Sequence, residues 1–243
     1  MKKLRVLDLF SGIGGFSLGL ERTGGFETVA FCEIEEFPRR VLEKHWPEVP
    51  CHDDVRTLNV EPGIADVVCG GFPCQDISNA GERAGISGER SGLYREMVRT
   101  IRVVRPRYAV MENVAALLHR GLGEVVGDLA EIGYDAEWHC LPAGHFGASH
   151  ERDRIWIIAN SQEARCPHIE GWTGPAEQVR GQIITSDDVG RRPRQRSAEP
   201  ALVRVVHGVS ADVDAVAALG NSIHPSVAEI IGQAILKAEG LTP

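Results

Sequence analysis

The sequence predicts an α/β protein built on a doubly wound, mostly parallel sheet with a small loop-rich insertion. Short apolar runs alternate with stretches of helical spacing along most of the chain, as expected where helices join parallel strands. Glycine-rich segments follow two of the apolar runs, near Gly12 and Gly70. Sheets of this kind bind their ligands at the carboxyl ends of the strands, so these segments mark the expected site.

The expected elements follow one another along the chain. Residues 4–10 form a buried strand, residues 11–15 a glycine loop, and residues 16–22 a helix with Phe16 and Leu20 on one face. Pro225 suits the first turn of a last helix. Further strands are expected at 27–32, just before Asp53, and at 65–69, 108–111, 136–141 and 155–159, and further helices at 37–45, 95–104, 122–132 and 226–238.

Composition limits the class of protein. A chain of 243 residues can bury one substantial core, and its formal charge of −8 argues against a non-specific nucleic-acid coat protein. No run approaches the roughly 20 apolar residues of a membrane helix, so no membrane association is expected. The six cysteines include no Cys-x-x-Cys pair, and Cys166-Pro-His168 lacks a second ligand pair. We therefore expect no metal, and reduced thiols in a cytoplasmic protein.

One segment, Gly70-Gly71-Phe72-Pro73-Cys74-Gln75, suggests a reactive thiol. It follows an apolar strand, and Pro73 fixes the backbone directly before Cys74. This arrangement would hold a thiol rigidly at the end of a strand. A cysteine buried for packing alone is the simpler alternative, but it gains nothing from such an approach.

The first loop suggests a nucleotide-like cofactor. Its glycines let the backbone come close to a ligand beside the start of a helix. Glu33 stands 21 residues after Gly12, at the end of the second strand, where an acid commonly binds ribose. Asp54 follows the third strand and could take an adenine amino group. These features indicate an adenosine-containing cofactor without separating a nicotinamide cofactor from S-adenosylmethionine.

A set of motifs in a fixed order separates the two. In chain order, these motifs are Phe10-Ser11-Gly12-Ile13-Gly14-Gly15, Gly71-Phe72-Pro73-Cys74-Gln75, Glu112-Asn113-Val114, Arg152-Asp153-Arg154 and Gly220-Asn221-Ser222. Through them the chain strongly resembles the DNA cytosine carbon-5 methyltransferase family, over residues 4–159 and roughly 201–238. The resemblance implies a Rossmann-like S-adenosylmethionine-dependent methyltransferase fold of compact, bacterial or phage-like type. It also implies S-adenosylmethionine as cofactor and S-adenosylhomocysteine as product.

The resemblance assigns four catalytic residues. Cys74 would add as a thiolate to carbon 6 of cytosine, which makes carbon 5 able to attack a sulfonium methyl group. Glu112 would protonate or hydrogen-bond ring nitrogen 3 and the exocyclic amine. Arg152 and Arg154 would hold the cytosine oxygen and the loop that carries the nucleophile. Without the resemblance, the two arginines could equally be an ordinary charged strand edge.

The resemblance also assigns the cofactor pocket, and it implies that the last helix packs beside the first. The glycine loop would line the methionine and adenosine parts, Glu33 would bind the ribose hydroxyls, and Ile34 would pack on the adenine. The residues expected in the pocket are Phe10, Ser11, Gly12, Gly14, Gly15, Glu33, Ile34, Asp54, Val55, Pro73, Leu93, Asn221 and Ser222.

We expect three regions. Residues 1–159 would form the catalytic and cofactor-binding domain, and residues 201–243 would return to it. Residues 160–200 lack periodicity, are rich in Gly, Pro, Gln and Arg, and would form a target-recognition segment. Most relatives have a far longer recognition region. We therefore expect a short target site, or help from a partner or a second copy.

The expected substrate is double-stranded DNA, whose cytosine must leave the stack to react. Residues 76–92, rich in glycine and serine, would close over the flipped base. Alternatives are an RNA cytosine methyltransferase, a degenerate copy that binds cofactor or DNA without turnover, and a nicotinamide oxidoreductase. The Cys-Phe-Thr element of the transfer-RNA branch is absent from the sequence, and an oxidoreductase would leave Phe72-Pro73-Cys74-Gln75 unexplained.

Overall fold

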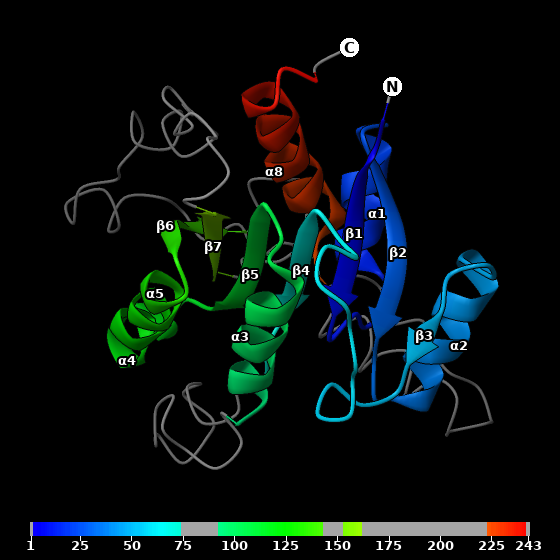
Figure 1. Cartoon of the computed structure of the whole chain (residues 1–243), viewed down its shortest axis with the longest axis horizontal. Helices are drawn as coiled ribbons and strands as arrows, with labels where there is room; N and C mark the ends of the chain where they lie inside the picture. Colours follow the sequence, from blue (N-terminus) through cyan, green and yellow to red (C-terminus); the bar gives the residue numbers. More distant parts are fainter. Residues whose placement is uncertain (1, 74–91, 143–152, 162–222, 242–243) are drawn as a thin grey trace, which may run out of the picture.

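A computed structural model describes residues 2–73, 92–142, 153–161 and 223–241 (Figure 1). Strands and helices alternate through most of this part of the chain. In order, the elements are β1 (Leu4–Leu9), α1 (Gly15–Arg22), β2 (Phe26–Cys32), α2 (Glu36–His45), β3 (Cys51–His52), β4 (Val67–Gly71), α3 (Gly92–Val104), β5 (Tyr108–Val114), α4 (Leu117–Arg120), α5 (Leu122–Glu131), β6 (Tyr134–Pro142), β7 (Asp153–Ser161) and α8 (Pro225–Ala238).

The described strands form one seven-stranded sheet in the order β3-β2-β1-β4-β5-β7-β6. The pairs among β3, β2, β1, β4 and β5 are parallel, and β7 runs antiparallel to both β5 and β6. The order reverses between β1 and β4, which is the switch point where doubly wound sheets bind ligands. The predicted fold class is confirmed.

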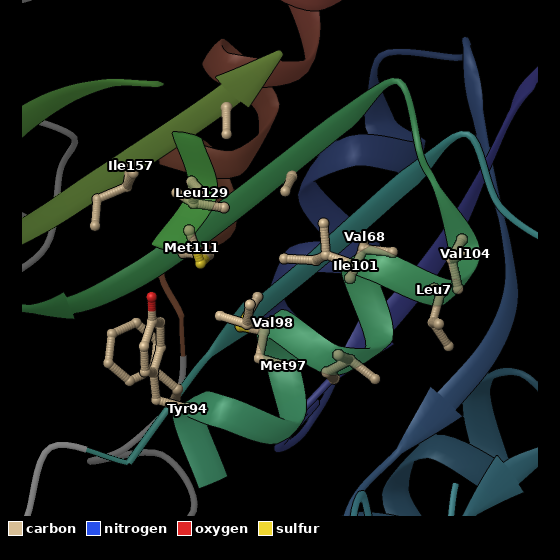
Figure 2. Close-up of a cluster of buried hydrophobic side chains, with 14 of the residues drawn as sticks. Leu7, Val68, Tyr94, Met97, Val98, Ile101, Val104, Met111, Leu129 and Ile157 are labelled. Atoms are coloured by element: carbon tan, nitrogen blue, oxygen red, sulfur yellow. The ribbon is translucent and has the colours of Figure 1, made fainter. Parts of the chain in front are cut away.

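The sheet separates two hydrophobic cores. On one face, α3 and α5 pack on the strands through residues such as Met97, Ile101 and Leu129 (Figure 2). On the other face, α1 and α8 contribute Phe16 and Ile231, among others. Both faces of β1, β4 and β5 are therefore covered, which explains why these strands are continuous apolar runs in the sequence.

The C-terminal helix α8 lies directly against α1, as expected from the resemblance. A Cβ at Gly19 would stand 2.2 Å from the carbonyl oxygen of Pro225 and 2.7 Å from the Cβ of Ala228. A Cβ at Gly15 would stand 2.4 Å from the carbonyl oxygen of Ile223. Two glycines one turn apart on α1 thus allow the backbones of the two helical segments to touch.

Two details differ from the predicted elements. The strand predicted over residues 65–69 does not end before the two glycines, since β4 continues through Gly70 and Gly71. Gly70 is paired with Leu9, whose carbonyl oxygen would lie 2.4 Å from an added Cβ, so glycine permits a close approach of the strands here. The short helix α4 was not predicted, because four residues are too few to show a helical period.

The described part of the chain contains free cysteines but no candidate metal cluster. Cys32, Cys51, Cys69 and Cys140 are free thiols. No cluster of three or more His, Cys, Asp or Glu side chains suited to a metal ion occurs among these residues. No described helix has the length and hydrophobicity needed to cross a membrane.

Candidate active site at the carboxyl edge of the sheet

Most of the described residues predicted for the site meet at one edge of the sheet. The parallel strands β1, β2, β3 and β4 all end there, and the first residues of antiparallel β7 lie at the same edge beside the end of β5. This arrangement brings together the glycine loop after β1, Glu33 after β2, Asp54 after β3 and Glu112 on β5. The sheet topology thus collects segments that are far apart in the sequence.

The glycine loop between β1 and α1 has an unusual backbone. Phe10, Gly12 and Gly14 all have positive φ, of 52°, 53° and 85°. Phe10 is not a glycine, so its conformation is a local strain of the kind that collects at functional sites. A Cβ at Gly12 would meet no atom within 4 Å, whereas one at Gly14 would strike Trp46 at 2.7 Å. The loop is therefore open at Gly12 and packed at Gly14.

Glu33 is held beside this loop by two backbone hydrogen bonds. Its Oε2 accepts from the backbone N–H of Gly12 at 2.7 Å, and its Oε1 accepts from Glu35 at 2.8 Å. The side chain is buried, and each carboxylate oxygen has a further lone pair. Such an oriented carboxylate can accept hydrogen bonds from a pair of vicinal hydroxyl groups.

Ser11 joins the ends of β1 and β2. Its hydroxyl donates to the carbonyl oxygen of Asp8 at 2.6 Å and lies 3.3 Å from that of Cys32, and the N–H of Cys32 donates back to it at 3.2 Å. The Ser11 side chain is therefore turned into the protein. It joins the start of the glycine loop to the ends of both strands.

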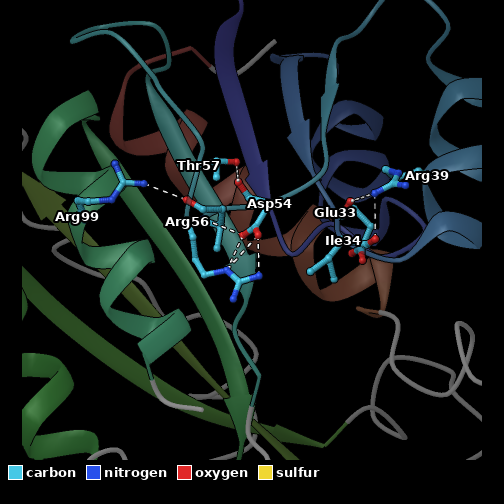
Figure 3. A network of polar contacts seen from close by, with 8 residues as sticks. Glu33, Ile34, Arg39, Asp54, Arg56, Thr57 and Arg99 are labelled. Atoms are coloured by element: carbon cyan, nitrogen blue, oxygen red, sulfur yellow. Dashed lines mark hydrogen bonds and ion pairs between the residues drawn. The ribbon is translucent and has the colours of Figure 1, made fainter. Parts of the chain in front are cut away.

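Ile34 lies on the outside of the same region, with 60% of its surface exposed. An isoleucine so exposed beside an oriented carboxylate offers an apolar contact for a ligand ring. Arg39 of α2 fixes this segment, because its Nη1 donates to the carbonyl oxygens of Ile34 at 2.9 Å and Glu33 at 3.3 Å (Figure 3).

Asp54 begins a compact loop after β3 (Figure 3). Arg56 donates to both of its carboxylate oxygens, with Nη2 at 2.7 Å from Oδ2 and Nε at 2.9 Å from Oδ1. These hydrogen bonds lower the pKa of Asp54. The backbone and side chain of Thr57 both donate to the Asp54 carbonyl. Val55, which follows, is buried in the core.

Glu112 and Arg154 form an ion pair next to the end of β4. The Nε of Arg154 lies 2.7 Å from the Oε1 of Glu112, and both side chains are largely buried. A Cβ at Gly71 would lie 3.0 Å from the Oε2 of Glu112 and 3.2 Å from the Cδ1 of Ile223. The carboxylate therefore stands over Gly71, three residues before Cys74, with the start of the α8 segment beside it.

Asn113 was not predicted as a site residue, yet it holds the chain that leads to Cys74. Its side-chain amide donates to the carbonyl oxygen of Phe72 at 3.0 Å, and its Oδ1 accepts from the N–H of Val114 at 2.8 Å. Phe72 packs on Tyr94 of α3. The signal in the sequence was a polar amide side chain within an apolar strand, because a buried polar group needs a hydrogen-bond partner.

Asp8 was also missed as a site residue. It is fully buried in β1, and its Oδ2 accepts from the hydroxyl of Ser17 at 2.8 Å and from the Ser17 N–H at 3.3 Å. Ser17 lies in the first turn of α1, which has no side-chain cap from its own N-cap residue Gly14. Asp8 therefore caps α1 from the neighbouring strand and fixes the far end of the glycine loop.

Asp8 predicts a pH dependence of stability. Burial raises the pKa of Asp8 from 3.8 to about 7, although the hydrogen bonds from Ser17 act to lower it. A hydrogen bond with Cys69 on β4 also lowers this pKa, and the nearby charge of Glu33 raises it. At pH values between 3.8 and about 7, Asp8 carries a proton in the folded state and has lost it in the unfolded chain. Stability therefore falls as pH rises through this window, by about 3 kcal/mol from pH 5 to pH 8 for this group.

The test compares the wild type with Asp8→Asn, which keeps an acceptor for Ser17 and cannot ionise. In urea unfolding at pH 5 and pH 8, the variant should become more stable relative to the wild type at the higher pH. All other titrating groups are common to both proteins and cancel. A difference that stays constant between the two pH values would contradict the assignment of this proton to Asp8.

Of the remaining predicted site residues, some lie within the described part of the chain and others lie outside it. Pro73 directly follows the end of β4, and Leu93 in the first turn of α3 packs against the core. Cys74, Arg152, Asn221 and Ser222 lie outside the described residues, as do nearly all of residues 160–200. The exceptions in that segment are residues 160 and 161, which complete β7.

Comparisons of the sequence with known proteins give matches to one family. The model of the C-5 cytosine-specific DNA methylase family matches residues 4–187. Type II methyltransferase M2.BsuMI of Bacillus subtilis is 36% identical over 165 residues, which cover 65% of this chain and 42% of that protein. The chain spans about two fifths of the length of the first curated relatives it matches.

Solved structures show the same fold. One described as a DNA modification methyltransferase encoded within an E. coli prophage has a TM-score of 0.55 and 26% identity, over 68% of this chain and 49% of that one. The Entamoeba histolytica methyltransferase EhMeth has a TM-score of 0.67 over 98% of this chain and 99% of its own, and its 14% identity supports the fold alone. With a family model that matches most of its length, this chain belongs to the C-5 cytosine-specific DNA methylase family.

Proposed function

We propose that this chain transfers a methyl group from S-adenosylmethionine to carbon 5 of cytosine in double-stranded DNA, through a covalent adduct with Cys74. The observation that carries the proposal is the ion pair of Glu112 and Arg154 beside Gly71. The pair holds the Glu112 carboxyl group beside Gly71, in the segment that leads to Cys74. The glycine loop follows β1, on the other side of the switch point. Membership of the methylase family supports the same reaction.

The reaction divides between three side chains. The Cys74 thiolate forms a bond to carbon 6 of the cytosine, and the ring electrons move toward nitrogen 3 and carbon 5. Glu112 holds or gives a proton at nitrogen 3, which stabilises this charge. Arg154 keeps Glu112 in place through its Nε hydrogen bond. After methylation, a base or water takes the proton from carbon 5, and the electrons of that bond form the carbon 5–carbon 6 double bond. The bond from carbon 6 to sulfur breaks at the same time, so the thiolate leaves and the aromatic ring is restored.

The pocket residues fit S-adenosylmethionine, which supplies an electrophilic methyl group when bound. The oriented carboxylate of Glu33 suits the ribose hydroxyls, and exposed Ile34 suits one face of the adenine. The loop is open at Gly12, where a Cβ would meet nothing within 4 Å. Asp54 and Val55 would hold the adenine edge, and Asn221 and Ser222 the methionine end.

Target recognition is assigned to residues 160–200. Because a recognition segment as short as residues 160–200 offers little contact area, we propose a short target site, or recognition shared with a partner or a second copy. A local basic surface must attract DNA to a protein whose net charge is −8, so affinity should fall with salt. We assign no metal to the reaction.

The deciding experiment measures transfer of labelled methyl groups to unmethylated DNA of mixed sequence, followed by bisulfite sequencing. Label at carbon 5 of cytosine within one short sequence is expected. DNA that contains 5-fluorocytosine at that sequence should form a covalent complex, because the fluorine cannot leave as a proton does. Peptide mapping of the complex should place the attachment at Cys74.

Two outcomes would contradict the proposal. Label in RNA rather than DNA, with both offered in competition, would make the substrate RNA. Binding of S-adenosylhomocysteine without transfer to either nucleic acid, and without a trapped complex, would make the chain a binding protein.

A further inference from the structure

A guanidinium that the proposed function does not use lies against the loop expected to hold the adenine edge. Arg99 of α3 donates from its Nη2 to the carbonyl oxygens of Val55 at 2.9 Å and Leu58 at 3.2 Å. Figure 3 shows Arg99 reaching toward the loop that carries Asp54, Arg56 and Thr57. Its Nε is paired with Glu96 one turn earlier on the same helix. Glu96 thus holds the planar guanidinium of Arg99 at α3, and the Nη2 of this group donates to the loop.

Arg99 joins this loop to α3 by side-chain hydrogen bonds. The hydrogen bonds from Thr57 and Arg56 to Asp54 fix the internal shape of the loop, but they join it to no other element. β3, which precedes the loop, has two residues. The buried side chains of Val55 and Leu58 fix the depth of the loop in the core, and Arg99 supplies the polar connection to α3.

The helix that carries Arg99 is a firm support. Tyr94, Met97 and Ile101 of α3 are buried in the core beneath the sheet (Figure 2). A loop connected to such a helix is held to within the small displacement that a packed core permits. Arg39 of α2 makes an equivalent pair of contacts to the carbonyl oxygens of Glu33 and Ile34, on the ribose side.

We propose that Arg99 is a positioning residue for adenine recognition. It holds the loop that places the Asp54 carboxylate against the adenine amino group, and it does so without touching the cofactor. The inference rests on the proposed function, since it takes the loop at Asp54 and Val55 as the adenine site. Arg39 has the corresponding task for Glu33 and Ile34.

The matched experiment uses S-adenosylhomocysteine and its hypoxanthine analogue, which carries an oxygen in place of the amino group. Calorimetry would give both dissociation constants for the wild type, Arg99→Met, Arg99→Lys, Arg39→Met and the exposed control Arg102→Met. A role in positioning the adenine edge moves the ratio of the two constants, whereas a change on the ribose side or a general loss of stability moves both constants together. Thermal unfolding of each variant checks that it is folded.

For Arg99→Met, we expect the dissociation constant of S-adenosylhomocysteine to rise about tenfold, as for one lost hydrogen bond to a charged group. The constant of the hypoxanthine analogue should change much less, so the preference for adenine falls. Arg39→Met should weaken both ligands alike, and Arg102→Met neither. Arg99→Lys should restore the preference in part, because one ammonium cannot reproduce the fixed geometry of the guanidinium.

Three results would overturn the assignment. An unchanged adenine preference in Arg99→Met, with the wild type binding S-adenosylhomocysteine, would remove the positioning role and leave the proposed function standing. Full recovery in Arg99→Lys would assign the effect to charge alone. Absence of S-adenosylhomocysteine binding by the wild type would overturn the proposed function, and this inference with it.

Discussion

Glu112→Gln is expected to lower kcat by a factor of about 10² to 10⁴ while cofactor affinity stays unchanged. Glutamine keeps the shape of the side chain and an oxygen that can accept from the Nε of Arg154. It cannot give up or hold a proton at cytosine nitrogen 3, so the charge that forms when the thiolate adds is left unstabilised. The loss should therefore appear in the chemical step.

The measurement is single-turnover methyl transfer, with the dissociation constant of S-adenosylhomocysteine taken separately. Glu124→Gln is the control, because Glu124 is an exposed carboxyl group on α5, outside the proposed site. A single-turnover rate constant for Glu112→Gln within tenfold of the control would show that the carboxyl group has no essential proton to hold. A rise in the dissociation constant alone would make Glu112 a structural residue of the pocket.

Gly19→Ala is expected to destabilise the fold by about 3 kcal/mol and to weaken cofactor binding at the same time. The new methyl group would lie 2.2 Å from the carbonyl oxygen of Pro225 and 3.0 Å from the backbone nitrogen of Glu229. These are backbone atoms of the start of α8, so the helix itself must move. Ile223, which lies over Gly15 and Gly71, would move with it.

The control for this change is Gly127→Ala, in the exposed part of α5. A Cβ there meets no atom within 4 Å, so alanine should be neutral or stabilise the helix by up to about 1 kcal/mol. Thermal unfolding and calorimetry with S-adenosylhomocysteine would be measured on both variants. If Gly19→Ala unfolds at the same temperature as Gly127→Ala, the contact between α1 and α8 is not as close as described.

The sequence predicted the order of the strands and helices, because their hydrophobic periods are clear and the connections are short. It also placed Glu33 correctly at the end of β2, since the distance from Gly12 to an acid after the second strand is set by the length of one strand–helix–strand unit. The return of α8 to α1 was expected from the resemblance. These features depend on local pattern and on motif order.

Other features depend on which atoms meet across the fold, and no local pattern shows them. The pairing of Arg154 with Glu112 needs the register of β5 against β7, in which Val114 stands opposite Arg154. The cap that Asp8 supplies to α1 joins a strand to a helix nine residues away. Arg99 resembled any charged residue on an amphipathic helix, because its two carbonyl partners lie 41 and 44 residues away.

The contact between α1 and α8 joins the first and the last of the described helices, and this orders events during synthesis. Roughly 200 residues separate Gly19 from Pro225, which a ribosome needs about 10 to 40 s to add. During that interval Gly19 of α1 lacks its contact with Pro225 of α8, and Gly15, at the end of the glycine loop, lacks its contact with Ile223. The nascent chain should therefore remain unable to hold its cofactor tightly until α8 has left the ribosome, and a stalled chain would be a target for chaperones.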